Sequence, residues 1–419
     1  MSVSKIRGIF GGDAVKRIRF TSGRMLTVAA VGSMVMGGIA LSGVIAAPPA
    51  SAAGSPVNIM IEGAISGPVY ALPEMVTGAQ AAVDRLNKEG GVDGQTVKLI
   101  TCDDQGNPNN DAACGREAVA DHVVAAVGSL SIYDNDFIPA LAAANIPYFA
   151  STDINPIDHT SPVSFPVNAS ATDYTAEGEL LAKDSGKCTD AAILGVDQPG
   201  TTQGMSFIVN AFKAKGGKTI KEYLYPNTTS DFAPLVATAT AAGAKCISMI
   251  GGPQSVVGIL EAVKQTGQKI PVNTNLATIV PALYTPVGFP TGELTVNGTY
   301  FVPGPGTSSA ALSQFESDMK ATGVTGAAGA VDTLSENGYQ GVLMFADAAK
   351  GLKTITGPAL LANVKNMTNV NTGLTPAFSL AKSGVFPGYP QDRDNHEVYY
   401  SWTGSGLKEE GTFAVAPAK

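Results

Sequence analysis

The stretch Val124–Thr152, which reads VAAVGSLSIYDNDFIPALAAANIPYFAST, decides the fold class of this chain. A short apolar run, Val123–Val127, breaks into Gly-Ser-Leu-Ser, and an apolar helical stripe then runs over Tyr133–Ala144. A second apolar run, Ile146–Ala150, breaks into Ser-Thr. This order predicts a strand, a helix and a strand. Because open α/β sheets bind ligands at the carboxyl ends of their strands, we expect the two polar turns to form half of a ligand cleft.

The same alternation of strand and helix continues on both sides of this stretch. Further strands are expected at 57–64, 97–101, 191–196, 219–225, 246–250 and 271–274, and helices at 74–88, 109–122, 173–183, 203–215, 231–242 and 256–266. Asn109 or Asn110 is expected to cap the second helix. Alternation over this length predicts doubly wound parallel sheets, and right-handed crossovers would place every strand-to-helix turn on one edge.

In the C-terminal third, the regular alternation of strand and helix ends. Residues 295–307 read as a strand that runs into a Gly/Pro corner, which suits a crossing between domains. Helices are expected at 309–322, 332–352 and 358–367, a loop at 373–390 and a final strand at 396–403.

Composition restricts the class of partner. The 419-residue chain has a net charge of -8, and only 15% of its residues are charged. It therefore lacks the basic surface that would neutralise phosphates, which argues against nucleic acid and anionic membranes as partners.

The first fifty-three residues read as a signal peptide. A basic start precedes the apolar segment Met25–Ala47, and Pro48–Ala53 offers cleavage after Ala52 or Ala53. A retained transmembrane anchor is the alternative, because the apolar segment is long enough to cross a bilayer. Export is expected in either case.

An even number of cysteines in an exported protein suggests two disulfides. Four cysteines allow three connectivities. We favour Cys102–Cys114, which would join a strand end to an early helical turn, and Cys188–Cys246, which precede two strands expected to be neighbours. Their spacing does not fit a zinc site, and His122, His159 and His396 are scattered.

The sequence contains no G-x-S-x-G, GxxxxGK[ST], G-x-G-x-x-G or HExxH motif. Asp103 and Asp104 are adjacent and point to different sides of an extended chain, so turn capping is favoured over acid/base work. Ser129, Ser131 and Ser151 have no histidine near them in sequence. We therefore expect neither an enzyme nor a cofactor.

Three segments together carry a family resemblance: EGAISGP at Glu62–Pro68, TGAQAAVDRLNKEGGVDGQTVKLITCDDQGNP at Thr77–Pro108, and the two turns described above. In this order they resemble the substrate-binding proteins of branched-chain amino acid ABC transporters, which are type I periplasmic binding proteins. The resemblance extends from Val57 to the C-terminus. It implies two Rossmann-like, doubly wound lobes that are joined by a three-segment hinge and close on a ligand.

The resemblance also implies boundaries and partners. We expect lobe 1 to comprise residues 54–169 and 304–373, and lobe 2 to comprise 170–303 and 374–419. A monomer that delivers its ligand to a membrane permease, powered by a separate ATPase, is the implied assembly.

The family's ligand-binding positions fall on strand-end turns of both lobes. The carboxylate-binding turns match Ser129–Tyr133 and Ala150–Thr152, an aromatic that covers the ligand matches Tyr70, and the second lobe contributes Gln198–Gln203 and Pro253–Ser255. The expected ligand-binding residues are Ser66, Tyr70, Ser129, Leu130, Ser131, Tyr133, Ala150, Ser151, Thr152, Gln198, Thr202, Gln254 and Asn275.

One departure from the family concerns the ligand. Family members that bind amino acids hold the α-ammonium with an acidic residue after the strand expected at 271–274, where this chain has Asn275-Leu276-Ala277-Thr278. A buried ammonium needs a paired charge, so an amino acid ligand would need Asp197 or Asp153 instead.

We therefore predict an exported binding protein for an amino acid, an amide or a carboxylate-bearing compound. A ligand-sensing module for a receptor or regulator is the main alternative. A secreted hydrolase, which would need a nucleophile with an oriented base, is the third.

Overall fold

The computed structural model describes residues 55–67, 71–183, 188–198, 200–276, 284–304 and 309–417. The predicted signal peptide, its anchor alternative and Tyr70 lie outside these residues. Within them, no helix is both long and apolar enough to cross a membrane.

The first sheet is parallel and has the strand order β2-β1-β3-β4-β5. Its strands are β1 (Val57–Gly63), β2 (Val97–Asp103), β3 (Ala125–Val127), β4 (Tyr148–Phe149) and β5 (Ser164–Phe165). Ile59, Met60 and Ile61 on β1 are fully buried. Their unbroken apolar run is typical of a parallel strand that is covered on both faces.

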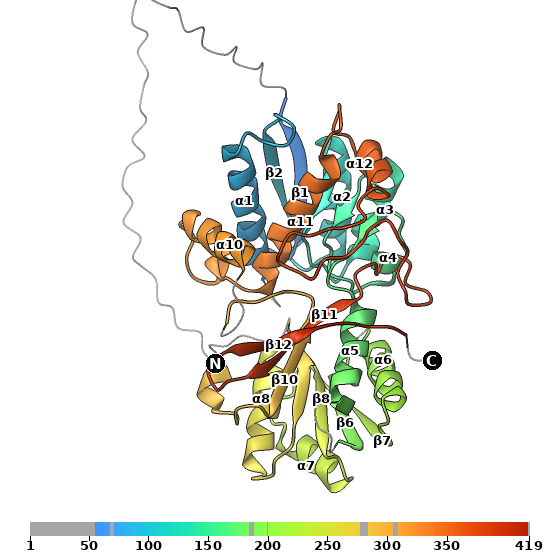
Figure 1. Cartoon of the computed structure of the whole chain (residues 1–419), viewed down its shortest axis with the longest axis vertical. Coiled ribbons are helices and arrows are strands. Elements are labelled where there is room, and N and C mark those ends of the chain that lie inside the picture. Colours follow the sequence, from blue (N-terminus) through green and yellow to red (C-terminus); the bar gives the residue numbers. More distant parts are fainter. Residues whose placement is uncertain are drawn as a thin grey trace, which may run out of the picture. The chain divides into compact units, whose positions relative to one another are not determined.

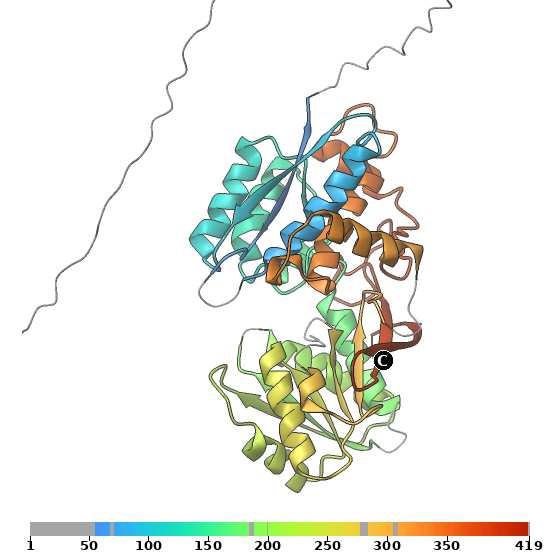
Figure 2. The ribbon, with the colours of Figure 1, turned by 90° about the vertical axis from the view of Figure 1, so that its left-hand side faces the viewer.

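Helices cover both faces of this sheet. They are α1 (Pro73–Lys88), α2 (Pro108–Ala120), α3 (Asp134–Ala144), α4 (Pro156–Thr160), α10 (Ala310–Ala321), α11 (Thr333–Ala349) and α12 (Gly357–Val364). Helix α1 packs on α11 and α10, and α2 packs on α3. The blue and orange helices lie on one side of the strands and the teal helices on the other (Figure 2). The order β3, α3, β4 confirms the predicted βαβ unit.

The second sheet has the order β12-β11-β10-β9-β8-β6-β7. Its strands are β6 (Asp190–Val196), β7 (Thr219–Tyr225), β8 (Cys246–Ile250), β9 (Val272–Asn275), β10 (Leu294–Gly298), β11 (His396–Trp402) and β12 (Leu407–Ala414). Strands β6 to β10 pair in parallel, whereas β11 is antiparallel to both β10 and β12.

Among the described residues of this second lobe, the helices are labelled α5, α6, α7 and α8 (Figure 1). They span Ser170–Lys183, Thr201–Ala214, Ala233–Ala241 and Pro253–Gln265, respectively. Helix α5 packs on α6 and contacts β8, β9, β10 and β11, while α7 packs on α8. The two α/β sheets confirm the predicted fold class of two doubly wound lobes.

The chain passes between the two sheets three times: from β5 to α5, from β10 to α10, and before β11. Hydrogen bonds join these segments to one another. Thr172 Oγ1 donates to the Asp394 carbonyl at 3.1 Å, and the Tyr400 hydroxyl donates to the Tyr300 carbonyl at 2.8 Å. The segment before β11 also bonds to the first lobe, where Gln391 N donates to the His159 carbonyl. The exact lobe boundaries remain a prediction.

Both disulfides have the favoured pairing. The Cα atoms of Cys102 and Cys114 are 5.7 Å apart, and those of Cys188 and Cys246 are 5.8 Å apart. The first disulfide joins β2 to α2. The second fastens the segment before β6 to the start of β8, its neighbour in the sheet.

The structure also adds elements that the sequence pattern did not predict: α4, β5 and β12. Strand β5 has two residues, and β12 carries a charged, alternating sequence, so neither produces an apolar run. The predicted cap of α2 was wrong. Asn107 is the N-cap, and its Oδ1 accepts a hydrogen bond from Asn109 N at 2.9 Å.

Candidate functional site

The turns after β3 and β4 lie side by side, as the quoted stretch predicts. Gly128 N donates to the Phe149 carbonyl at 2.7 Å, and Thr152 N donates to the Ser129 carbonyl at 3.0 Å. Gly128 and Ala150 both have a left-handed backbone, with φ of 55° and 56°. The two turns therefore form one hydrogen-bonded unit at the carboxyl edge of the first sheet.

The serine hydroxyls of these turns point into the lobe. Ser129 Oγ donates to the Glu62 carbonyl, and Ser131 Oγ lies 3.2 Å from Asp104 Oδ2 and 3.1 Å from Asp111 Oδ1. Ser151 Oγ pairs with the Ser164 hydroxyl at 3.2 Å. Because all three side chains are fully buried, they stabilise the turns from the interior of the lobe.

Other residues predicted for the first-lobe site keep some exposure. Ser66 is exposed and donates to Asp103 Oδ2 at 2.5 Å, while the Ile65 and Ser66 amides donate to Asp103 Oδ1. This confirms the turn-capping role predicted for Asp103. Leu130 and Tyr133 are half-buried, and Thr152 is 8% exposed.

In the second lobe, the predicted residues also lie at strand ends. Gln198 follows β6, Thr202 is in the first turn of α6, and Gln254 is in the first turn of α8; all three are exposed. Asn275 ends β9 and is half-buried. Ala277 and Thr278 lie outside the described residues.

A cavity of about 150 Å³ lies where the two lobes meet. Its lining comes from the segment after β4, from α5 and from the start of α6: Asp153, Ile154, His159, Ser170, Tyr174, Gln198, Gly200, Thr201, Gln203, Gly204 and Phe207. Gln198 is the residue of the predicted site that lines it. The cavity thus combines polar groups with two aromatic side chains.

Asp153 organises the polar wall of this cavity and is itself 3% exposed. Its Oδ1 lies 2.9 Å from His159 Nδ1, and its Oδ2 accepts a hydrogen bond from Ser170 Oγ at 2.9 Å. The His159 ring packs against the Tyr389 ring in a tilted arrangement, with a centroid separation of 4.0 Å. Ser170 therefore bonds to the carboxylate and not to the imidazole, which is not the nucleophile–base contact that covalent catalysis uses.

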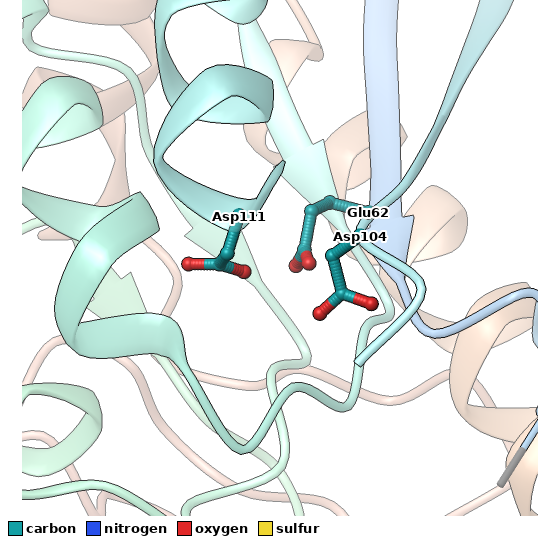
Figure 3. A group of neighbouring side chains, drawn as sticks. All are labelled: Glu62, Asp104 and Asp111. Atoms are coloured by element: carbon teal, nitrogen blue, oxygen red, sulfur yellow. The ribbon is translucent and has the colours of Figure 1, made fainter. Parts of the chain in front are cut away.

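A group of buried acids lies behind the first-lobe turns. Glu62 is the penultimate residue of β1, Asp104 follows β2, and Asp111 is in the first turn of α2 (Figure 3). One carboxylate oxygen of each lies within 4.8 Å of the others. Asp134 at the start of α3 and Asp158 in α4 are also fully buried. We call these five residues the acid cluster.

Burial raises the pKa values of the acid cluster. The pKa of Glu62 lies well above its ordinary value, chiefly because the carboxyl group is buried and secondly because the negative charge of Asp111 is close to it. Burial likewise raises the pKa of Asp111 to about 6 and that of Asp158 to about 7. The pKa of Asp134 is raised in the same way by burial and by the charge of Asp158.

The sequence pattern predicted only part of the cavity wall, namely the turn Gln198–Gln203 and Asp153 as an alternative acid, and it missed the acid cluster. The residues concerned come from separate segments, and no motif joins Asp111 or Asp134 to Glu62. The signal for Asp153 was its place directly after the Ala-Ser-Thr turn. Asp104 was predicted to cap a turn, and it does accept a hydrogen bond from Gly106 N at 2.8 Å, but it also belongs to the cluster.

Comparison with known proteins identifies the family. A sequence profile described as periplasmic binding protein matches residues 56–387. The chain belongs to this family. The resemblance seen in the sequence is thereby confirmed, and the family is one of solute-binding proteins whose members are exported.

Two curated relatives match a shorter segment. The Leu/Ile/Val-binding protein BraC3 of Rhizobium johnstonii is 36% identical over 76 residues, which is 18% of this chain and 21% of the relative. The Leu/Ile/Val-binding protein homolog 3 of Brucella melitensis is 36% identical over 80 residues, 19% of this chain and 22% of the relative. The matched segment thus spans about a fifth of each relative.

Solved structures share the fold over most of the chain. A leucine-, isoleucine-, valine-, threonine- and alanine-binding protein from Brucella ovis in a closed conformation has a TM-score of 0.72 at 17% identity, covering 87% of this chain and 98% of its own. A fatty acid ABC transporter substrate-binding protein from Thermomonospora curvata has a TM-score of 0.71 at 15% identity, covering 86% and 92%. An R. palustris solute-binding protein in complex with 4-hydroxybenzoate has a TM-score of 0.69 at 18% identity, covering 87% and 98%.

Proposed function

We propose that this protein is the extracytoplasmic solute-binding protein of an ABC importer. It captures a small organic ligand between its lobes and delivers it to a membrane permease with its ATPase. The observation that carries the proposal is the cavity at the junction of the lobes, to which the segment after β4 and the start of α6 both contribute. A ligand that touches both walls stabilises the closed state, because only closure brings both sets of contacts together.

The ligand contacts are proposed at both strand edges. On the first lobe they are Ser66, Leu130, Tyr133, Thr152 and the backbone of the two turns, because the hydroxyls of Ser129, Ser131 and Ser151 are already bonded inside the lobe. Tyr70 would cover the ligand. On the second lobe the contacts are Gln198, Thr202, Gln254 and Asn275.

The cavity lining indicates which ligands fit. Asp153 supplies a carboxylate to the cavity in place of the missing acid after Asn275, and an ammonium group would have to pair with it beside the His159 and Ser170 contacts that it already makes. Tyr174 and Phe207 offer aromatic surface and suit an apolar or aromatic body. A branched-chain amino acid and a hydroxybenzoate-like acid are therefore the two classes to compare first.

The test is a thermal-shift screen on the secreted protein, with its N-terminus defined by mass spectrometry to check cleavage near Ala52 or Ala53. The panel contains leucine, isoleucine and valine, short amides, 4-hydroxybenzoate and a fatty acid. A ligand present at a hundred times its Kd should stabilise the folded state by about 2.7 kcal/mol and raise the midpoint. The transport proposal fails if a cooperatively folded protein responds to no member of the panel.

The site is tested with two variants and a matched control. Thr152→Ala and Gln198→Ala should each weaken the ligand found in the screen by about tenfold, the loss expected for a hydrogen bond or two in a buried site. Thr238→Ala is the control, because Thr238 bonds to the Pro234 carbonyl within α7 and is exposed. Unchanged affinity in both site variants would refute the proposed contacts, while leaving the transport proposal standing.

A further inference from the structure

The acid cluster presents more buried negative charge than its surroundings neutralise. Glu62 is 1% exposed, and Asp104, Asp111, Asp134 and Asp158 are fully buried. Among the residues that the structure describes, the ion pairs are Arg85–Glu89, His159–Asp153, Lys215–Glu179, His396–Asp394 and Lys408–Glu410. None of these cations reaches the cluster. An ionised carboxylate buried without a counter-charge is strongly unfavourable.

Glu62 and Asp111 of the cluster also each have an oxygen with no hydrogen-bond partner in the described part of the chain. These are Glu62 Oε1 and Asp111 Oδ2. Buried polar atoms in native proteins are almost always satisfied, so a group of such oxygens in one place indicates a missing partner.

Burial raises the pKa of Asp104, and the hydrogen bonds that this carboxylate accepts act in the opposite direction. Asp104 accepts from the Gly106 amide at 2.8 Å, and both donors to it, Gly106 N and Ser131 Oγ, bind the charged form best. Ser131 Oγ lies between Asp104 and Asp111, but its single proton can serve only one of them. Without a cation, protons alone would have to neutralise the remaining carboxylate oxygens at the pH to which an exported protein is exposed.

The donor set and its spacing resemble those of a hard-cation site. Glu62, Asp104 and Asp111 point their carboxylates toward a common space (Figure 3). Their nearest oxygens lie within 4.8 Å of one another, and oxygens on opposite sides of Ca²⁺ are about 4.8 Å apart at Ca–O distances of about 2.4 Å. All donors are oxygens. Zn²⁺ is usually held by histidine and cysteine, and Mg²⁺ needs a tighter octahedron.

We infer that Glu62, Asp104 and Asp111 form a buried binding site for a hard divalent cation of the Ca²⁺ type, with Ser131 Oγ as a further oxygen donor. The cation would neutralise the cluster and hold together β1, the loop after β2, α2 and the turn after β3. This inference does not depend on the identity of the transported ligand or on the transport proposal. Nothing in the ligand cleft itself is needed for it.

The first experiment uses the unmodified, full-length secreted protein. We expect elemental analysis to find about one Ca²⁺ per chain after purification in calcium-containing buffer. We expect removal of the ion with EGTA to lower the thermal midpoint, and added Ca²⁺ to restore it in a saturable way that equal ionic strength of NaCl does not reproduce. Mg²⁺ should restore the midpoint only at higher concentration.

The second experiment uses near-isosteric variants with a matched control. Glu62→Gln and Asp111→Asn should each weaken Ca²⁺ binding at least about tenfold by calorimetry, because each removes one charged ligand. Glu177→Gln is the control, since Glu177 is likewise a fully buried acid but lies in α5 of the second lobe. It should retain the affinity of the native protein.

The outcome that overturns the inference is defined on the native protein, so it does not depend on the folding of any variant. If calcium-loaded and EGTA-treated protein carry no stoichiometric metal and melt at the same temperature with Ca²⁺, Mg²⁺ or Mn²⁺ added, the cluster is neutralised by protons. Equal Ca²⁺ affinity in the native protein, Glu62→Gln and Asp111→Asn would also refute this assignment, because binding would then lie elsewhere.

Discussion

Gly128 shows how one residue determines the geometry of the candidate site. It follows β3 with a φ of 55°, and a Cβ placed there would lie 2.5 Å from Gly338 Cα and 2.6 Å from the Asn337 carbonyl oxygen of α11. The backbone of α11 cannot give way as a flexible side chain would. Only glycine meets both the conformational and the spatial requirement.

Gly128→Ala should therefore lower the free energy of unfolding by more than about 3 kcal/mol, because strain and overpacking add. Urea denaturation measures this change. Gly267→Ala is the matched control, since Gly267 has a φ of 67° and a Cβ placed there would have no described atom within 4 Å. It should cost about 1 kcal/mol, the contribution of the left-handed backbone alone. Equal losses would show that contact with α11 is unimportant.

Glu177 is a second residue with a measurable consequence. It is fully buried on α5, and Ser248 Oγ of β8 donates a hydrogen bond to its Oε1. Burial raises its pKa from 4.5 to about 8. The folded protein thus binds this proton more tightly than the unfolded chain does. The stabilisation is complete below pH 4.5 and is lost as the pH rises toward 8.

Glu177→Gln removes this titration. Relative to the native protein, the variant should become more stable as the pH rises from 5 to 8, by up to about 1.4 kcal/mol for each pH unit. Chemical denaturation at several pH values gives the difference in unfolding free energy. Glu316→Gln, at an exposed position of α10, is the matched control for the substitution itself. A flat difference for Glu177→Gln would contradict the assigned shift.

The two disulfides constrain different elements. Cys102–Cys114 closes a separation of 12 residues and fastens β2 to α2, and both Asp104 and Asp111 lie within the loop that it closes. Cys188–Cys246 closes 58 residues and fastens β8 to the chain entering β6. Loop-closure entropy in the unfolded chain grows with the length of the closed loop.

Replacing Cys188 and Cys246 with serine should lower the free energy of unfolding by about 4 kcal/mol, against about 3 kcal/mol for Cys102 and Cys114. Equilibrium denaturation of the two double variants, compared with the native protein, measures both losses. The reverse order would mean that the shorter bridge acts through native packing around α2 more than through the unfolded chain.

Element by element, the sequence pattern was sufficient where an apolar run or stripe was long. It located α1, β6, β8 and α11 within a few residues, because these elements bury a face that the spacing of apolar residues reveals. It failed for β5 and β12, which are strands only because β4 and β11 hydrogen-bond to them. Such elements depend on neighbours that are remote in the sequence.

At the scale of the whole molecule, three chain crossings connect the two lobes, and these crossings are hydrogen-bonded to one another. Asn297 Nδ2 near the end of β10 donates to the Asp173 carbonyl of α5 at 3.0 Å and to Glu397 of β11 at 3.0 Å, so one side chain joins all three crossings. The cavity lies beside this junction, where Tyr389 contacts both His159 and Gln203. The proposed ligand capture by closure would therefore involve the same segments that connect the lobes.

The sequence alone determined the alternation of strand and helix and the family, and it favoured the disulfide pairing that the structure shows. These follow from local periodicity, from neighbouring strands and from motifs that are contiguous in the chain. The tertiary structure alone decided which way the hydroxyls of the opening stretch point. Ser129 and Ser131 face a group of acids that comes from β1, the loop after β2, α2, α3 and α4. Carboxylates this far apart in sequence become neighbours only when the sheet edge forms, and no local pattern encodes their distance.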